Sequence, residues 1–289
     1  MLTKAEFHKL CASGPILLDG ATGSNLQKAG MPRGCCTEMW VLEHPEALKA
    51  LQRQYISCGS QVLYAPTFQA QPMALEKQGL SRDTEKINAA LVALTRSVAK
   101  GALVAGNLTT LAAFTESFDE ENFDLLVENY RRQIKGLMDG GADLLAAETL
   151  MYPLEAEAIL TAAELENAGA ALYTFTMQPD GSLFSGRDAG PVLRSLEQAG
   201  AAAVGFNCVA AGPMTPGLVS YLRRYVKGPL VCKPNAGDPV IGPDGLAHYP
   251  MEHDEFAGIM AQCIQNGAAV LGGCCGTDPQ FIKAIRDRL

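Results

Sequence analysis

Three cysteines in the second half of the chain are the residues best suited to chemistry. Cys208 follows the apolar run AAVGFN, and Cys274 and Cys275 follow the apolar run AAVLGG. Zinc binds thiolate sulfur well, and a catalytic zinc site has three protein ligands and one open position. If the two runs form nearby strands, their ends bring the sulfurs together, and the adjacent glycines permit the sharp turn this requires. The pattern predicts a zinc site.

Other interpretations of the cysteines stay open at this point. An adjacent pair is a weak motif, since another occurs at Cys35 and Cys36 in MPRGCCTEMW, which we interpret as a surface or lid feature. A vicinal disulfide between Cys274 and Cys275, formed after metal loss, is a second alternative, and simple packing is a third. Packing is the expected role of three further cysteines, Cys58, Cys232 and Cys263.

Composition indicates an ordinary globular protein. The 289 residues are 48% hydrophobic and 19% charged, with a formal net charge of −8. No basic cluster is present, so nucleic acid is not an expected partner. The N-terminus does not resemble a signal peptide, and no run of about 18 apolar residues suggests a membrane span. Nine cysteines are too few and too scattered for a disulfide scaffold, so we expect a cytoplasmic protein.

The chain alternates short apolar runs with amphipathic segments. The apolar runs cover residues 15–20, 61–67, 102–108, 143–149, 171–176, 202–208, 229–235 and 268–275. Strands that are apolar throughout are buried on both faces, which is typical of a parallel sheet covered by helices. An open doubly wound sheet would be favoured by a GxGxxG turn, and the chain has none. The sequence therefore predicts an α/β fold, a (β/α)8 TIM barrel, as a single domain over residues 1–289.

The predicted strand ends collect polar and sulfur-containing side chains. Active sites of such barrels lie at the C-terminal ends of the strands. The residues found there are Asp19, Gly20, Ala21, Thr67, Phe68, Asn107, Glu148, Thr149, Thr176, Asn207, Cys208, Lys233, Pro234, Asn235, Cys274 and Cys275. They are the candidate site.

Six motifs also give the chain a family resemblance. ILLDGATGSNLQKAGMP, APTFQAQ, AAET, GFNC, KPNAG and GGCCGT occur in this order between about residue 14 and the C-terminus. In this respect the chain resembles zinc-dependent homocysteine S-methyltransferases, above all the homocysteine-binding domain of cobalamin-dependent methionine synthase. The resemblance implies transfer of a methyl group to the thiol of homocysteine, or of a similar compound, giving methionine.

The resemblance also implies roles for individual residues. The zinc ligands would be Cys208, Cys274 and Cys275, with Asn235 beside the metal and able to fill its open position. The remaining substrate-binding residues would be Asp19, Gly20, Ala21, Thr67, Phe68, Glu148 and Asn207, with Glu148 holding the substrate ammonium group. Two of these have simpler alternatives: Asp19 as a turn residue and Glu148 as a structural ion pair with a basic side chain.

The chemistry explains the choice of sulfur ligands. A free thiol has a pKa near 8.5 and is mostly protonated at neutral pH, whereas coordination to zinc deprotonates it. Three cysteine thiolates leave zinc with a net charge of about −1, so a fourth, substrate sulfur stays electron-rich. No protein base is then required beside that sulfur.

The methyl donor is less well defined by the sequence. Methionine synthase uses further domains for folate and cobalamin, and this chain shows none, so we expect a methylcobamide carried by a separate corrinoid protein. A small donor such as S-methylmethionine is the alternative. Differences from the family pattern at Pro66 and in AGNLTT lie on the expected donor side.

Two other functions compete with methyl transfer. A zinc hydrolase is disfavoured because the four histidines form no HxH or HExxH motif. A non-catalytic zinc- or thiol-binding protein is the more distant alternative. The long segment GDPVIGPDGLAHYPMEHDEF, after the seventh run, is a candidate lid.

Overall fold

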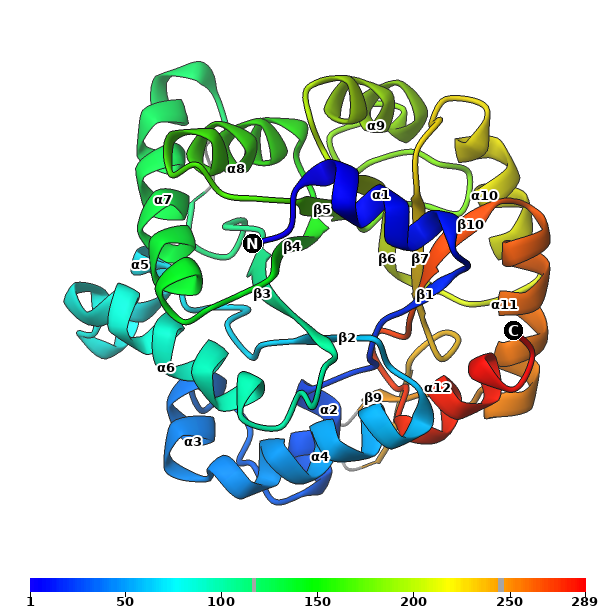
Figure 1. Ribbon diagram of the computed structural model, residues 1–289, viewed down its shortest axis with the longest axis horizontal. Coiled ribbons are helices and arrows are strands. Elements are labelled where there is room, and N and C mark those ends of the chain that lie inside the picture. Colours follow the sequence, from blue (N-terminus) through cyan, green and yellow to red (C-terminus); the bar gives the residue numbers. More distant parts are fainter. Residues whose placement is uncertain (116–117, 244–246) are drawn as a thin grey trace.

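Eight parallel strands form a barrel in the computed structural model, which describes residues 1–115, 118–243 and 247–289 (Figure 1). The strand order is β1-β10-β7-β6-β5-β4-β3-β2, so neighbours around the sheet follow the chain. A parallel bridge between Leu18 and Val62 closes the circle. Gln61 reinforces this seam, because its side-chain oxygen accepts a hydrogen bond from the Leu17 N–H at 2.8 Å. The predicted TIM barrel is confirmed.

The barrel strands coincide with the eight predicted apolar runs. They are β1 (Ile16–Leu17), β2 (Val62–Tyr64), β3 (Leu103–Thr109), β4 (Leu144–Leu150), β5 (Ala171–Phe175), β6 (Ala203–Ala210), β7 (Leu230–Asn235) and β10 (Ala268–Leu271). Strands β4 and β6 run past their predicted ends, and each contains a register shift there.

Helices surround the barrel (Figure 1). The outer helices are α4 (Pro45–Cys58), α6 (Thr84–Arg96), α7 (Phe123–Asp139), α8 (Pro153–Leu165), α9 (Ala189–Gln198), α10 (Thr215–Arg223), α11 (His253–Gln265) and α12 (Pro279–Arg286). Helix α4 begins with Pro45 and ends at Gly59, whose φ of 112° is the left-handed conformation that glycine adopts readily at helix ends. Shorter helices, α2 (Gly23–Lys28), α3 (Thr37–Glu43) and α5 (Pro72–Leu75), lie in the loops after β1 and β2.

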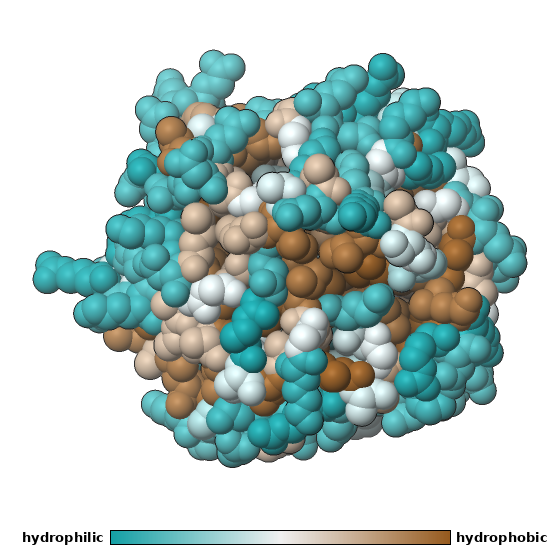
Figure 2. All heavy atoms as spheres, in the orientation of Figure 1, coloured by the Kyte–Doolittle hydropathy of each residue, from teal (hydrophilic) through white to brown (hydrophobic). Residues whose placement is uncertain are grey.

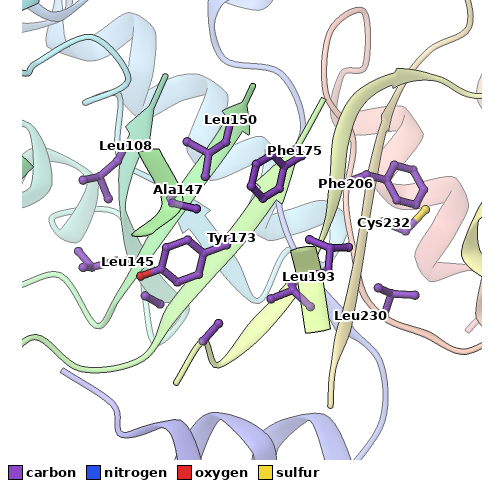
Figure 3. Close-up of a cluster of buried hydrophobic side chains, with 14 of the residues drawn as sticks. Leu108, Leu145, Ala147, Leu150, Tyr173, Phe175, Leu193, Phe206, Leu230 and Cys232 are labelled. Atoms are coloured by element: carbon purple, nitrogen blue, oxygen red, sulfur yellow. The ribbon is translucent and has the colours of Figure 1, made fainter. Parts of the chain in front are cut away.

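Alternating strand residues build two separate apolar layers. In β4, Leu144 and Ala146 belong to a cluster inside the barrel, whereas Leu145 and Ala147 pack outward with the helices. Figure 3 shows part of this outer layer, including Leu145, Tyr173 and Phe206. Side chains two residues apart share a face of a strand. Residues at the C-terminal strand ends that follow this alternation from the inner cluster therefore point into the barrel mouth.

Helix α1 (Lys4–Ala12) covers the N-terminal end of the barrel (Figure 1). Thr3 and Glu6 form a capping box that starts the helix, and Phe7 is fully buried in the inner cluster. Leu2 bonds to the backbone of Asp143 and Ala170, just before β4 and β5. On this face, hydrophilic residues cover the surrounding helices and hydrophobic ones gather toward the middle (Figure 2). The covered end leaves the opposite mouth for ligands.

The predicted lid segment contains an antiparallel pair of short strands, β8 (Val240–Ile241) and β9 (Ala247–His248). Residues 244–246 of this segment lie outside the described residues. Across the described ranges, no helix is long and apolar enough to cross a membrane.

Candidate active site

The three cysteine sulfurs meet at the C-terminal mouth of the barrel. The Sγ atoms of Cys208, Cys274 and Cys275 lie within 4.8 Å of one another, and those of Cys208 and Cys275 are 3.9 Å apart. All three cysteines are free of disulfides. Hydrogen bonds from Cys208 and Cys274 lower the pKa of the Cys275 thiol to about 3, whereas the pKa values of the Cys208 and Cys274 thiols are raised. Without a metal the cluster therefore holds one thiolate, at Cys275, which attracts a cation.

Cys208 reaches the cluster because β6 is irregular at this point. The register between β6 and β7 shifts between Asn207 and Ala210, and Cys208 has a φ of 57°. A non-glycine residue is uncommon in this left-handed region and is held there by its surroundings. Thr149, at the register shift of β4, has a φ of 59°. Both strands thus bend where they enter the site.

Asn207 holds these two bends together. Its Oδ1 accepts hydrogen bonds from Thr149 N at 2.7 Å and Thr174 Oγ1 at 2.9 Å. Its Nδ2 donates to Thr149 Oγ1 at 2.8 Å and points to the Cys274 sulfur at 3.7 Å. Asn207 is fully buried, so its contacts are to the protein.

The turn after β10 aims the other two sulfurs. Cys274 N donates to Pro234 O at 2.7 Å, and Cys275 N donates to Asn235 Oδ1 at 3.0 Å. The side-chain oxygen of Asn235 thus supports the cysteine turn. Gly276 completes the turn with a φ of 81°.

A cavity of about 340 Å³ opens beside the sulfurs. It is lined by Asp19, Gly20, Ala21, Thr22, Gly23, Ser24, Thr37, Glu38, Tyr64, Ala65, Pro66, Phe68, Gln69, Asn107, Glu148, Thr149, Cys208, Lys233, Cys274 and Cys275. This set includes eight of the eleven site residues predicted from the sequence. Thr67, Asn207 and Asn235 are absent from the lining in the described part of the chain. The Thr67 hydroxyl instead donates to Asn107 O at 2.8 Å.

A buried ion pair forms the floor of this cavity. Lys233 Nζ lies 3.1 Å from Glu148 Oε2, and both side chains are less than a tenth exposed. Asn107 Nδ2 donates to Glu148 Oε1 at 3.0 Å, and the Lys233 ammonium lies 5.0 Å from the centre of the Tyr64 ring. Glu148 thus does pair with a basic side chain, and this pair faces the cavity.

Asp19 adds a second carboxylate to the same floor. Its Oδ2 accepts from Tyr64 N at 2.8 Å, while its Oδ1 is buried without a hydrogen-bond partner among the described residues. Two buried carboxylates thus face one buried ammonium, Lys233. When both carboxyl groups are ionised they carry one negative charge more than Lys233 balances, and Asp19 Oδ1 is an unused acceptor, so the site suits a cationic ligand.

The pKa of Asp19 makes stability depend on pH. Burial raises this pKa to about 7, although Lys233 lowers it in part, whereas an unfolded aspartate titrates near about 3.9. The stabilisation from the protonated form is complete below about pH 4 and is lost as the pH rises through about 7. In the parent protein, this titration should lower the free energy of unfolding by about 2–3 kcal/mol between about pH 5 and 7. In Asp19→Asn, which cannot titrate, that part of the decrease should be absent. Urea titrations of metal-free protein measure this, and equal falls in parent and variant would contradict it.

For several residues that line the cavity, the sequence predicted no role in the site. Lys233 lies at a predicted strand end. Because it is two residues from Val231, which belongs to the cluster inside the barrel, its side chain also points into the barrel. Tyr64 follows Val62 in the same way. Glu38 could not be found, because it comes from α3 in the loop after β1. Its buried Oε1 accepts from Gln69 N at 2.8 Å.

The other cysteines lie outside the cluster. Cys58, Cys232 and Cys263 are buried in α4, β7 and α11, as expected for packing residues. Cys36 precedes α3, and its thiol lies 3.5 Å from Glu38 Oε2, beside the cavity. Cys35 bonds to Pro32 O at 3.0 Å in the same loop. The second cysteine pair therefore belongs to a segment that borders the site.

Comparison with known proteins identifies the family. A family model described as "Homocysteine S-methyltransferase" matches residues 16–289. The chain belongs to this family. It is thus a methyltransferase. Homocysteine S-methyltransferase from Escherichia coli K12 is 29% identical, over 94% of each chain. Homocysteine S-methyltransferase 2 from Zea mays is 25% identical, over 96% of this chain and 91% of the maize protein.

A longer protein is also similar to this methyltransferase. Methionine synthase from Mycobacterium tuberculosis is 27% identical over 92% of this chain. The chain spans only about a quarter of that protein, since the match covers 24% of its length.

Solved structures agree with the family assignment. The metallated form of the homocysteine methyltransferase MmuM from Escherichia coli superposes with a TM-score of 0.81 and 26% identity, covering 96% of both chains. The oxidized form of that enzyme also has a TM-score of 0.81.

Proposed function

We propose that this methyltransferase transfers a methyl group to the sulfur of homocysteine, giving methionine, at a zinc ion held by Cys208, Cys274 and Cys275. The observation that carries the proposal is that the three sulfurs and the buried carboxylates Asp19 and Glu148 line one cavity. A thiol bound at the sulfurs can thus present its amino group to the carboxylates.

The geometry of the sulfurs fits zinc. Two sulfurs, each about 2.3 Å from a tetrahedral zinc ion, lie about 3.8 Å apart. The Cys208 and Cys275 sulfurs, at 3.9 Å, already have this spacing. Three thiolates and an open side toward the cavity match a catalytic site rather than a closed structural one. Zinc bound there would hold the substrate sulfur as an electron-rich thiolate.

The floor of the cavity supplies the substrate contacts. Lys233 balances one of the two carboxylates, which leaves one negative charge for an ammonium group. We assign that group to Asp19 Oδ1 and Glu148, which are both buried and both interact electrostatically with Lys233. The Ser24 hydroxyl is also buried without a partner among the described residues, and we assign it to the substrate carboxylate. These contacts position the sulfur for in-line attack.

We further propose that the methyl group comes from a methylcobamide carried by a corrinoid protein. The similarity to the mycobacterial methionine synthase supports this donor. Asn207 and Asn235 then act by holding the cysteine ligands, and Thr67 by holding β3 beside the pocket. A small donor such as S-methylmethionine remains the second candidate, because the Escherichia coli and maize relatives match the chain over nearly their whole lengths.

The test uses zinc-loaded protein, homocysteine and each donor in turn. We expect methionine to form with methylcobalamin and the zinc shell to gain a fourth sulfur on addition of homocysteine, as followed by X-ray absorption. If methionine formed only with S-methylmethionine, that compound would be the donor, and the methylcobamide proposal would be wrong. Binding of zinc and homocysteine without product from either donor would contradict the enzymatic proposal and favour a binding protein.

A further inference from the structure

A tight turn in the loop after β2 forms part of the cavity wall. The Ala70 N–H donates to Thr67 O at 3.1 Å. This bond places Phe68 and Gln69 at the tip of the turn, and both of them line the cavity. Phe68 is half-buried and Gln69 is exposed, whereas the ion pair on the cavity floor is less than a tenth exposed. The turn therefore lies at the outer rim of the cavity.

Side chains of two outer helices anchor the base of this turn. Gln133 Nε2, on α7, donates to Thr67 O at 2.7 Å. Asn88 Nδ2, on α6, donates to Ala70 O at 2.8 Å. Both amide side chains are fully buried behind the loop. The two ends of the turn are thus joined to the helix layer, and the tip needs a contact of its own.

The tip is held by Glu38, which comes from α3 in the loop after β1. Glu38 Oε1 accepts the Gln69 N–H at 2.8 Å, and its Oε2 lies 3.5 Å from the Cys36 thiol. Burial raises the pKa of the Glu38 carboxyl, and the hydrogen bond from the Gln69 backbone partly offsets this. Buried ionisable groups in a cavity are typical of functional sites. One carboxylate therefore connects two loops at the rim.

A buried carboxylate beside a cavity can act through its charge on a ligand or through the groups that it holds. Glu38 is only 3% exposed although it lines the cavity, and each of its oxygens has a donor from the protein. Asp19 differs, since its Oδ1 is buried without a partner among the described residues. The contacts of Glu38 favour the second role, because its acceptors are already used.

We propose that Glu38 is a positioning residue that holds the Phe68–Gln69 turn against α3 by accepting the Gln69 N–H. The two loops then form one continuous wall at the rim, across which a methyl donor approaches the sulfurs. This consequence for catalysis rests on the proposed function, whereas the hold on the turn does not. The homocysteine contacts assigned above lie on the floor, so the wall acts on the approach of the donor.

Hydrogen exchange at the Gln69 amide, followed by fragmentation mass spectrometry on the full-length protein, reads the turn directly. Glu38→Ala removes the acceptor, so exchange should be about tenfold faster, the effect of one hydrogen bond to a charged group. Glu38→Gln keeps a carbonyl oxygen at the same place and should exchange within about twofold of the parent. Equal exchange in the parent and Glu38→Ala would overturn the inference.

Initial rates test the consequence for catalysis, with whichever of methylcobalamin and S-methylmethionine the parent uses. Glu38→Ala should lower kcat/KM for the donor about tenfold, because a loose wall no longer orients it. The Kd for homocysteine on zinc-loaded protein should stay at the parent value, and Glu38→Gln should keep the parent kinetics. A Glu38→Gln variant as slow as Glu38→Ala would show that the charge acts on a ligand, and would overturn the inference.

The matched control is Glu155→Ala. Glu155 is another fully buried carboxylate, on α8, and its Oε1 accepts the Leu111 N–H at 2.6 Å in the loop after β3. Leu111 is not among the described residues that line the cavity. This variant should speed exchange at Leu111 and leave exchange at Gln69 and the donor kcat/KM unchanged. An equal loss of kcat/KM in Glu155→Ala and Glu38→Ala would show general destabilisation and overturn the inference.

The two proposals fail in different ways. Absence of methyl transfer by the parent with both donors would overturn the proposed function, and exchange at Gln69 would still decide whether Glu38 holds the turn. Methyl transfer by the parent with an unchanged kcat/KM in Glu38→Ala would overturn the inference alone.

Discussion

Cys208→Ser is expected to reduce bound zinc from about one ion per chain to less than about a tenth, and to abolish methyl transfer. The loss is large because the three sulfurs already lie within 4.8 Å of one another, so each supplies a quarter of a tetrahedral shell. A serine hydroxyl stays protonated at neutral pH and is a poor zinc ligand. Cys275→Ser should behave in the same way. Elemental analysis of reduced, anaerobically purified protein measures the metal.

The matched control for these variants is Cys35→Ser. Cys35 is half-buried in the loop before α3, and its thiol bonds to the Pro32 carbonyl. This variant should keep the parent's zinc content. Equal zinc in Cys208→Ser, Cys275→Ser and Cys35→Ser would refute the metal site.

Lys233→Met is expected to destabilise the protein by about 3–5 kcal/mol, the cost of leaving a buried charge unpaired. Burial already raises the pKa of Glu148, and Lys233 is the largest influence that lowers it. Without the ammonium, the carboxylate must bind a proton or stay ionised in an apolar setting. The midpoint of urea unfolding measures the change.

The double variant Glu148→Gln/Lys233→Met separates stability from substrate binding. Removing both charges should restore most of the stability, because no unpaired charge remains. It should not restore homocysteine binding, since one of the two carboxylates assigned to the ammonium group is gone. The KM for homocysteine should therefore stay at least about tenfold above the parent value, the cost of one charge-assisted hydrogen bond. A stable double variant with the parent KM would show that Glu148 serves structure alone.

The sequence predicted the barrel because its signals were local. Largely apolar runs separated by amphipathic segments are typical of strands buried on both faces, and each run became one strand. Parallel order then put Asp19, Glu148, Lys233 and the cysteines at one mouth. Small helices such as α2 and α3 were not predicted, since their six and seven residues lie within loops whose packing decides the conformation.

Other parts of the site depend on contacts between distant segments. The Asn207 amide hydrogen-bonds the left-handed Thr149 and directly precedes the left-handed Cys208, and single-residue types give no sign of such bends. Glu38 lines the cavity from a loop helix, and Tyr249, which follows β9, lies against Gly276 of the cysteine turn. Spacing along the chain carries little information about either approach. The Glu148–Lys233 pair was partly predictable from the sequence, because both residues lay at predicted strand ends.

The bent ends of β4 and β6 have a consequence for protein design. Grafting three cysteines at matching positions onto a regular barrel would leave the strand 6 sulfur aimed elsewhere, because a straight strand alternates its side chains. The smallest transferable unit would include Asn207, Thr149 and Thr174 together with Cys208, since these hydrogen bonds define the bend. A metal centre of this kind is thus encoded by three consecutive strands, β4, β5 and β6, and a turn, so a designer would have to build these supports before placing the ligands.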